Sequence, residues 1–405
     1  QSYRRRGLAY DTGFHYVGGL DEGQPLHTVF TYLGLMQLPW QRLDHEFDKV
    51  TIGQRTFAFA QGYEDFTATL AAEFPSERPA LGRYAALLRR TSEQELDLLN
   101  PRAGKTVWPS RLVETSAWQY LNETFRNPLL VDVLSGTSLK MELRRDSLPL
   151  FTFLHGQSSF IESSWRLKGD GALITDRLVR GIGQQGGRVV CGAEVVELVE
   201  KCGRLSAADG EVYEGAVFIS DVHPGQTCKL VKQSERMKNA YRHRMAGLPN
   251  TFGMFTVSLR MKPRALEYFN YNRYVYAHPG VWTFYEEEEP VSGVMVACRV
   301  PEDGSRFTSQ VDLLTPMPWE RCMPWSNTKV GGRGEDYEAM KRCMADECIR
   351  LAERVVPGLR GWVAECYAST PLTYRDYIGA PEGTAYGLRK DYRNPLAALL
   401  SVRTP

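Results

Sequence analysis

Residues suited to ligand binding gather within the first twenty positions of the chain. The segment Asp11-Thr-Gly-Phe-His15 combines a carboxylate, a glycine and an imidazole, and Gly18-Gly19 follows it closely. An arginine triplet, Arg4 to Arg6, precedes it, and a guanidinium can bind a phosphate through two hydrogen bonds. Because glycine has no Cβ, the backbone here can approach a planar or anionic ligand closely. An exposed basic strand followed by an ordinary turn explains the same residues.

The segment from 160 to 224 contains the elements that would hold such a ligand. Gly169-Asp-Gly171 precedes a predicted helix over 172–182, and Gly186-Gly187 ends that helix. The spacing then predicts strands at 188–190 and 194–199, two hairpin turns, and a buried strand at 216–220. A helix crossover between strands predicts a parallel sheet, and ligands bind at the carboxyl ends of such strands. Ser220, Asp221 and His223 are therefore expected near a ligand.

The rest of the chain alternates helical and strand-like segments without an internal repeat. Apolar periodicity and Pro or Gly stops predict helices at 26–38, 63–74, 79–90, 110–125, 127–145, 229–246 and 337–356. Strands are predicted within 44–60, 251–262, 293–300 and 361–369.

Composition narrows the class of protein. The 405 residues predict two or three domains, and the formal net charge of +1 gives no reason to expect a nucleic-acid partner. The eight cysteines form no Cys-x-x-Cys pair, which favours free thiols in a reducing, cytoplasmic compartment. Cys343 and Cys348 have no histidine nearby, so no metal site is expected. No apolar run approaches the ~20 residues that span a bilayer.

Four motifs in order carry a family resemblance. The arginine-rich start with Asp11 to Gly19 is the first, and Glu162-Ser-Ser-Trp-Arg-Leu-Lys-Gly-Asp-Gly171 is the second. The unit from Gly187 to Pro224 is the third, and the block from Thr370 to Gly387, with Pro381-Glu-Gly383, is the fourth. Together they resemble the FAD-dependent polyene oxidoreductases, which include phytoene desaturases, carotenoid isomerases and retinol saturases within the flavin amine-oxidase superfamily.

The resemblance implies an α/β fold with two domains. One is an FAD-binding, Rossmann-like domain of the glutathione-reductase type with a β-meander, and the other is an α+β substrate domain. The chain would alternate between them: 1–60, 161–230 and 371–405 in the FAD-binding domain, and 61–160 and 231–370 in the substrate domain. The cofactor would be FAD and the substrate an apolar isoprenoid, either a carotenoid or a retinoid. Peripheral contact with a membrane is compatible with such a substrate, although no segment requires it.

The same resemblance suggests roles for individual residues. Arg4, Arg6, Asp11, Gly13, Gly169, Gly171, Val195, Ser220 and Asp221 would contact FAD. His15 would be a proton donor, since the pKa of a free imidazole lies near neutrality, although a structural histidine fits equally. Glu162 would be catalytic, or it would pair with Arg166 at a four-residue spacing. Glu382 would be a further catalytic residue at the substrate end of the site, which Tyr374 and Tyr386 would line, and core tyrosines are the alternative.

The flavin would carry the redox chemistry, while the protein holds a polyene against it and excludes water. Saturation, desaturation and isomerisation of double bonds are all open, and the Thr370 to Gly387 block favours the saturase and isomerase branch.

Two departures from the family widen the alternatives. The family begins with a strand and a Gly-x-Gly-x-x-Gly turn that opens a helix and binds the FAD diphosphate, and no such unit precedes Arg4. The glycine-rich strand and helix with which the family ends are not found either. We therefore expect this sequence to be an internal fragment of such an enzyme that lacks both terminal FAD motifs and binds FAD more weakly. The alternatives are a flavin amine oxidase and a non-catalytic fragment that cannot hold FAD.

Overall fold

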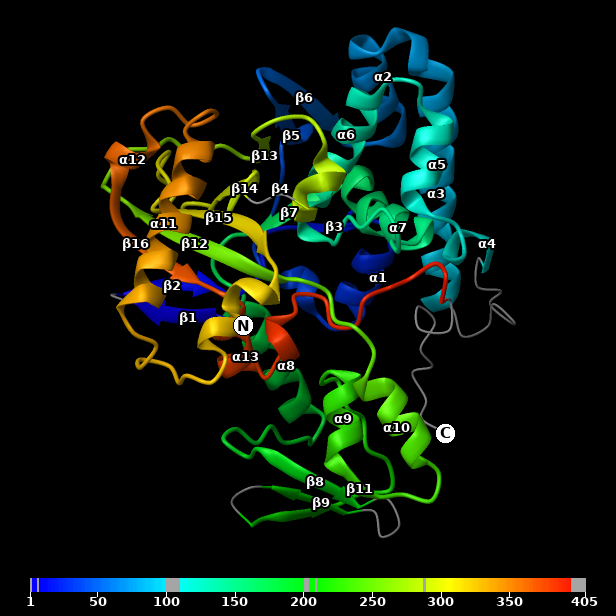
Figure 1. Cartoon of the computed structure of the whole chain (residues 1–405), viewed down its shortest axis with the longest axis vertical. Helices are drawn as coiled ribbons and strands as arrows, with labels where there is room; N and C mark the ends of the chain where they lie inside the picture. The colour runs from blue at the N-terminus through cyan, green and yellow to red at the C-terminus, as the bar shows by residue number, and fades with distance from the viewer. Residues whose placement is uncertain are drawn as a thin grey trace.

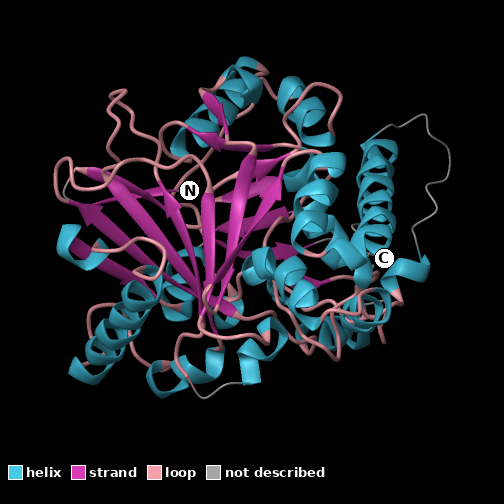
Figure 2. Cartoon of the chain, turned by 90° about the horizontal axis from the view of Figure 1, so that it is seen from above, coloured by secondary structure: helices cyan, strands magenta, loops and turns pink. Residues whose placement is uncertain are grey.

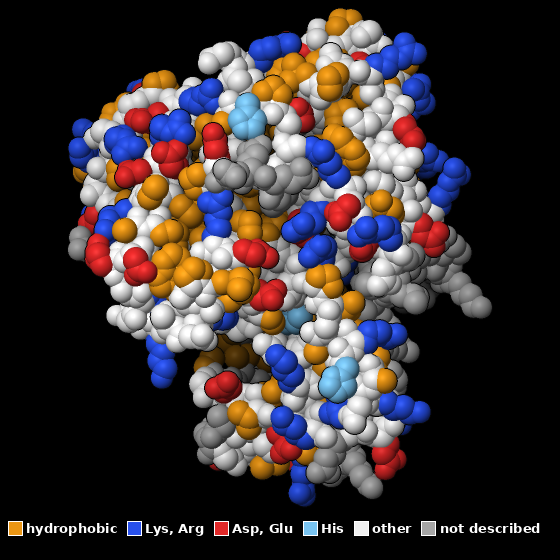
Figure 3. Space-filling model, in the orientation of Figure 1, with side chains coloured by type: hydrophobic (Ala, Val, Ile, Leu, Met, Phe, Trp, Pro, Cys, Tyr) orange, Lys and Arg blue, Asp and Glu red, His pale blue; other side chains and the backbone are white. Residues whose placement is uncertain are grey.

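The protein has a large main body and a smaller lobe, which lies at the bottom of the view in Figure 1. The computed structural model describes residues 2–5, 7–99, 110–199, 204–207, 210–286 and 289–394. A space-filling view shows a notch between the lobe and the body, with hydrophobic side chains on its wall (Figure 3). No helix within these residues is both long and apolar enough to cross a bilayer.

A twisted seven-stranded sheet forms the centre of the main body (Figure 2). Its order is β16-β12-β15-β14-β13-β5-β6, and every neighbouring pair is antiparallel except β13 with β5. The strands are β5 (Glu46–Ile52), β6 (Arg55–Ala60), β12 (Gly253–Met261), β13 (Asn272–Tyr276), β14 (Gly293–Cys298), β15 (Gln310–Met317) and β16 (Val363–Ser369).

Alternation along the strands divides the core between the two faces of this sheet. On β13 to β15, Tyr274, Met295 and Leu314 point into the core shared with the helices that follow β6 in the chain. Their neighbours Val275, Val296 and Leu313 point into a second core. Both faces of the sheet are therefore covered, which explains why β14 and β15 are buried along their whole length.

Helices cover the two faces unequally. One helix, α11 (Glu335–Ala352), packs on the face of the second core. The other face meets a helical bundle, seen at the upper right in Figure 1: α2 (Tyr63–Glu73), α3 (Arg78–Leu99), α5 (Ala117–Thr124), α6 (Pro128–Gly136) and α7 (Leu150–Glu162). Shorter helices are α1 (Pro25–Tyr32), α4 (Ser110–Val113), α12 (Leu359–Trp362) and α13 (Pro371–Ile378).

Two small sheets lie against the main one. The hairpin of β1 (Ser2–Arg5) and β2 (Leu8–Asp11) holds the arginine-rich start. A three-stranded sheet has the order β3-β7-β4, with bounds β3 (Val17–Gly18), β4 (Trp40–Arg42) and β7 (Ser164–Leu167). This second sheet joins the glycine-rich turn to the segment that leads into α8 (Ala172–Gln184).

The smaller lobe is built on a four-stranded sheet with the order β10-β9-β8-β11. The meander of β8 (Val195–Val199), β9 (Arg204–Ala207) and β10 (Val212–Glu214) is antiparallel, as the hairpin signals predict. The parallel neighbour of β8 is β11 (Val231–Gln233), which follows α9 (Pro224–Leu230) and precedes α10 (Asn239–Ala246). The predicted α/β fold with a β-meander is confirmed.

Several predicted elements are wrong. Residues 188–190 and 216–220 form no strand. The predicted helix over 229–246 is interrupted by β11, the one over 110–125 is divided into α4 and α5, and the one over 127–145 ends as an α-helix at Gly136. The apolar run at 216–220 is typical of a buried strand, but Val217 and Ile219 are 78% and 94% exposed. The run therefore has no sheet neighbour within the described lobe. Strand propensity needs a pairing partner, and such a partner is not encoded locally.

The predicted division of the chain into alternating segments remains a prediction. One observation bears on the first segment, 1–60: its residues 46–60 form β5 and β6, and β5 pairs with β13 from the segment 231–370. These two strands therefore belong to the same sheet as the predicted substrate domain.

Burial predicts which thiols react. Burial raises the pKa of Cys298 to about 12 and of Cys322 to about 11, whereas Cys191 and Cys343 are exposed. Because the thiolate is the nucleophile, a chromogenic disulfide will label Cys191 and Cys343 at least tenfold faster than the two buried thiols. Peptide mapping of the labelled protein at successive times checks this. Rapid labelling of Cys298 in the folded protein would contradict the packing described.

Candidate active site

A cavity of about 520 Å³ lies between the central sheet and the helical bundle. Its floor is the sheet, through Met254, Met295 and Leu314 on β12, β14 and β15, and α7 forms part of its wall with Thr152 and Phe160. A mostly apolar cavity of this size, with a few polar groups, is typical of a small-molecule site.

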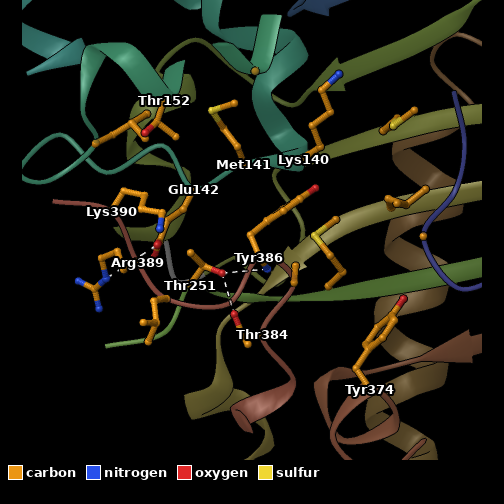
Figure 4. Close-up of a pocket in the computed structure, with 18 of the residues that line it drawn as sticks. Lys140, Met141, Glu142, Thr152, Thr251, Tyr374, Thr384, Tyr386, Arg389 and Lys390 are labelled. Atoms are coloured by element: carbon orange, nitrogen blue, oxygen red, sulfur yellow. Dashed lines mark hydrogen bonds and ion pairs between the residues drawn. The ribbon is translucent and has the colours of Figure 1, made fainter. Parts of the chain in front are cut away.

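The end of the described chain closes another side of the cavity. There Thr384 to Lys390 run alongside Thr251, whose hydroxyl contacts the hydroxyl of Thr384 at 2.7 Å and accepts from the backbone N–H of Tyr386 at 3.1 Å (Figure 4). Upstream, Thr370 and Thr373 form a capping box that starts α13, and α13 brings Tyr374 to the cavity. The Thr370 to Gly387 motif thus builds part of the cavity wall.

His15 and Gly13 meet this cavity from the glycine-rich turn. The turn passes α7 so closely at Gly18 that a Cβ there would lie 2.3 Å from the carbonyl carbon of Ser159. The Nε2 atom of His15 is buried and has no hydrogen-bond partner among the described residues. Burial also lowers the pKa of His15, so its imidazole is neutral at pH 7. A neutral imidazole with an unpaired nitrogen can bind a ligand but is a poor acid.

Asp11 lies behind the turn in a buried ion pair. Its carboxylate accepts from Arg299 Nη2 at 2.7 Å and from the backbone N–H of Gly171 at 2.8 Å. Arg299 also donates to the carbonyl of Gly169 at 3.1 Å. Burial raises the pKa of Asp11, although Arg299 opposes that shift. Three of the predicted cofactor residues, Asp11, Gly169 and Gly171, are therefore brought together beside His15, with Arg299 linking them.

A buried polar network continues from Tyr16, the residue after His15. The Tyr16 hydroxyl donates to Asp48 Oδ2 at 2.9 Å, contacts the Tyr274 hydroxyl at 2.8 Å, and accepts from Lys140 Nζ at 2.6 Å. Asn272 donates to the other oxygen of Asp48 at 2.8 Å. Burial raises the pKa of Asp48 to about 6 and lowers the pKa of Lys140 to about 8, although each charge opposes the shift of the other. Lys140 and Tyr16 both line the cavity.

The raised pKa of Asp48 makes stability depend on pH. Since the folded pKa lies above the unfolded one, Asp48 contributes stability that is fully present below about pH 4 and lost as the pH rises through about 6. The contribution is up to about 3 kcal/mol for two pKa units. Asp48→Asn lacks this titration, so its free energy of unfolding relative to wild type will rise from pH 4.5 to 7. Urea unfolding of both proteins measures the difference, and a constant difference would contradict the account.

The remaining predicted cofactor residues that the structure describes lie apart from the cavity. Arg4 is 74% exposed and lies 3.8 Å from Asp170, while Arg6 falls outside the described residues. Val195 starts β8 in the smaller lobe, where it pairs with Ala207. Ser220 and Asp221 are exposed in the same lobe, and the Ser220 hydroxyl contacts that of Thr227 at 2.7 Å. Their assignment to FAD stays a prediction.

Glu162 and Glu382 are not among the residues that line the cavity. Glu162 accepts from the Tyr63 hydroxyl at 3.0 Å. Its predicted helical pairing with Arg166 is wrong in its geometry, because α7 ends at Glu162 and Arg166 belongs to strand β7. Glu382 is exposed, accepts from Asn250 at 3.0 Å, and adopts a φ of 55° beside the cavity wall. Their catalytic roles stay predictions.

One stretch has the glycine spacing of a dinucleotide-binding turn but lies in the wrong place. Gly181-Ile-Gly-Gln-Gln-Gly186 has the pattern Gly-x-Gly-x-x-Gly. In the structure it covers the C-terminal end of α8, where the N–H of Gly187 bonds back to the carbonyl of Ile182. A diphosphate-binding turn precedes a helix and offers free N–H groups, so this stretch is a helix stop.

Comparisons with solved structures show which class of protein has this fold. An oxidoreductase from Methanosarcina mazei superposes with a TM-score of 0.57 at 14% identity, over 96% of this chain and 80% of that one. A redesigned putrescine oxidase superposes with a TM-score of 0.55 at 13% identity, over 98% and 81%. The chain therefore has the fold of these two oxidoreductases.

Comparison with curated sequences narrows the class. All-trans-retinol 13,14-reductases from Danio rerio and Homo sapiens are each 23% identical, over 95% and 96% of this chain and 71% of their own length. No family model matches the chain. The resemblance to the phytoene desaturase, carotenoid isomerase and retinol saturase family is confirmed, and the protein is an oxidoreductase that resembles the retinol saturases along nearly its whole length.

The described residues fit the ring end of a flavin. A planar ring with polar edges needs an apolar wall and a few hydrogen-bonding groups, and the turn with Gly13 and the unpaired His15 Nε2 supplies both beside the cavity. An ideal Cβ at Gly13 has no atom within 4 Å, so this side of the turn is open. Gly13 and His15 would therefore hold the ring, with Asp11 and Arg299 fixing the turn. A bound flavin would supply hydride transfer at this wall.

Sequence reasoning missed the residues that act over long sequence distances. Lys140 ends the 3-10 helix Thr137–Lys140 and reads as an ordinary lysine, yet its partner Tyr16 lies 124 positions away. Asp48 and Arg299 were missed for the same reason. The residues next to them in the sequence do not indicate a functional role. The best available indication is a charged residue at an inward-facing position of an alternating strand, as Asp48 is in β5.

Proposed function

We propose that this protein uses FAD to saturate a carbon–carbon double bond of a retinoid. The observation that carries the proposal is the apolar cavity of about 520 Å³ that ends at Gly13 and His15, because a polyene bound there would lie against the predicted flavin ring. The whole-chain similarity to all-trans-retinol 13,14-reductases supports a retinoid as the substrate.

Charge in the cavity wall argues against an amine as the substrate. Lys140, Arg389 and Lys390 all line the cavity, whereas its carboxylate Glu142 already lies 2.6 Å from Arg144 and 3.8 Å from Arg389. An ammonium substrate would meet three basic side chains against one carboxylate in this wall, and like charges repel strongly at low dielectric constant. A neutral polyene alcohol avoids that repulsion and gains from burial of its apolar surface.

The protein's own residues have separate tasks in this proposal. Met254, Met295, Leu314 and Phe160 bind the chain of the substrate and exclude water. Asp11 and Arg299 hold the glycine-rich turn, and His15 offers a hydrogen-bonding atom at its surface. Saturation also requires a proton, which these residues do not supply.

Equilibrium binding tests the proposal before any turnover is attempted. Titrating the purified chain with all-trans-retinol, in the presence and absence of FAD, should show saturable binding through quenching of tryptophan fluorescence. Putrescine and cyclohexylamine should not compete with retinol at concentrations where retinoid analogues do. Competition by the amines, or no saturable retinol binding with FAD present, would overturn the proposal.

A further inference from the structure

The ammonium of Lys140 lies between aromatic rings at the wall of the cavity. Its Nζ is 3.5 Å from the ring centroid of Phe160 and 4.5 Å from that of Tyr16. Lys140 and Phe160 line both the main cavity and a smaller hollow next to it, which Asp48 also lines. Figure 4 shows Lys140 beside Met141 on this wall. An amine in this place can reach a bound ligand from inside the protein.

Lys140 has more N–H donors than the described network uses. A tyrosine hydroxyl has one proton, which Tyr16 gives to Asp48, so Tyr16 accepts from Lys140 and from Tyr274. An ammonium has three N–H bonds, and Tyr16 is the acceptor that the described residues offer it. The rings of Phe160 and Tyr16 are also close to the ammonium, and Lys140 is among the residues that line the cavity.

The charged groups around Lys140 hold it in a state suited to an acid. Asp48 on β5 faces it through Tyr16, Tyr274 on β13 completes that contact, and Arg166 on β7 reaches Asp48 only through Asn272. Burial lowers the pKa of Lys140 to about 8, so the ammonium predominates at pH 7 but gives up its proton more readily than an exposed lysine. An acid is most effective when its pKa lies near the working pH.

We propose that Lys140 is the acid that protonates the substrate during saturation of its double bond, held in place by Tyr16 and Asp48. This step rests on the proposed function. Saturation adds a hydride and a proton across the double bond, and the hydride is the contribution of the reduced flavin. As one carbon accepts the hydride, the π electron pair forms a C–H bond with a proton from Lys140 Nζ. The N–H bond breaks, Lys140 becomes a neutral amine, and water entering after product release returns the proton.

Tyr16 and Asp48 are positioning residues in this step. The bond to Tyr16 fixes the ammonium at the wall, and the carboxylate of Asp48 favours the charged form. His15, the proton donor predicted from the sequence, is a weaker candidate, because burial lowers its pKa and leaves it neutral at pH 7.

The first test measures Lys140 without any turnover. The protein is exposed to a small acylating reagent at a series of pH values, and peptide mapping gives the labelling rate of each lysine. Labelling of Lys140 should be half maximal near pH 8, well below the pH at which a lysine in an unstructured peptide is half labelled. In Asp48→Asn the Lys140 profile should move to lower pH, because the carboxylate that favours the ammonium is gone. A Lys140 profile that coincides with that of the unstructured peptide would overturn the proposal.

The second test uses turnover with FAD and all-trans-retinol. Lys140→Met should lower kcat by about 100-fold or more, the usual effect of losing a general acid, and change retinol affinity by less than threefold. Lys140→Arg keeps the charge and should move the alkaline limb of the kcat profile to higher pH. Tyr16→Phe keeps the ammonium but loosens its position, so it should lower kcat less than Lys140→Met does.

The outcomes separate this step from the proposed function. A wild-type protein that turns over retinol alongside a Lys140→Met variant with kcat within threefold overturns the acid role and leaves the proposed function standing. A wild-type protein that binds FAD and retinol but forms no saturated product overturns both. Circular dichroism and melting of each variant show that it is folded, and the labelling profile decides the role of Lys140 if Lys140→Met does not fold.

Discussion

Arg299→Met will lower the free energy of unfolding by about 3–5 kcal/mol at pH 7, the usual cost of breaking a buried ion pair from one side. The side chains of Arg299 and Asp11 are 10% and 6% exposed, so removing the guanidinium leaves a buried carboxylate without its counter-charge. The variant also loses the hydrogen bond that holds the carbonyl of Gly169. We expect it to weaken FAD binding as well, because this bond fixes the turn predicted to face the cofactor.

The dependence on pH and two further variants sharpen this prediction. Protonated Asp11 needs no counter-charge, so the loss of stability should shrink as the pH falls. Asp11→Asn combined with Arg299→Met should be more stable than Arg299→Met alone. The surface pair of Arg204 and Glu214, 56% and 66% exposed, is the matched control, and Arg204→Met should cost less than about 1 kcal/mol. Urea unfolding of wild type and the three variants gives each free energy of unfolding. Equal losses of that free energy in Arg299→Met and Arg204→Met would refute the structural role of Arg299.

Thr152→Trp will raise the Kd for all-trans-retinol at least tenfold, which corresponds to about 1.4 kcal/mol. Thr152 lies on α7 and lines the cavity, where the larger indole would take space that the polyene needs (Figure 4). The side chain is partly exposed, so the change should leave the unfolding midpoint nearly constant. Tryptophan quenching is confounded by the new indole, so retinol binding is followed here by equilibrium dialysis.

Thr152→Val is the matched control for this variant. It keeps the size and branching of the side chain and should bind retinol as wild type does. Unchanged affinity in a folded Thr152→Trp would show that retinol binds elsewhere. A loss in both variants would show that the hydroxyl of Thr152, rather than the space around it, governs binding.

The sequence predicted those parts of the fold that local patterns determine. The amphipathic α11 and α8 with its Gly186-Gly187 stop are present, and so are the β8–β9–β10 meander and β5, β6, β12, β14 and β16 of the central sheet. Its other two strands, β13 and β15, were not predicted. The 216–220 segment was predicted as a strand because its apolar residues are typical of one, yet it is exposed. Whether a strand forms depends on its neighbours in the sheet, which the segment itself does not encode.

The candidate site likewise contains residues that a local motif predicts and residues that only the tertiary structure reveals. Motif resemblance could propose Asp11, Gly13 and His15 as site residues, because they lie together in one short turn. It could not find the partners that give them their chemistry, since Arg299 lies 288 positions from Asp11, and Tyr274 lies 258 positions from Tyr16. The resemblance suggested Glu162 for catalysis, and a helical ion pair with Arg166 was the alternative. Because α7 ends at Glu162, Arg166 lies on β7, where it donates to Tyr268 and Asn272 instead.

Anaerobic reoxidation of the reduced protein tests the central claim most directly. The chain is loaded with FAD, freed of unbound FAD by desalting, reduced without oxygen, and mixed with all-trans-retinol while the visible spectrum is recorded. The account predicts that the absorption of oxidised flavin returns, that the polyene absorption of retinol falls in equal amount, and that a dihydroretinol forms. If the bound flavin stays reduced when retinol is present, retinoid saturation is not the function. The same conclusion would follow if an amine reduced the oxidised flavin in a separate experiment.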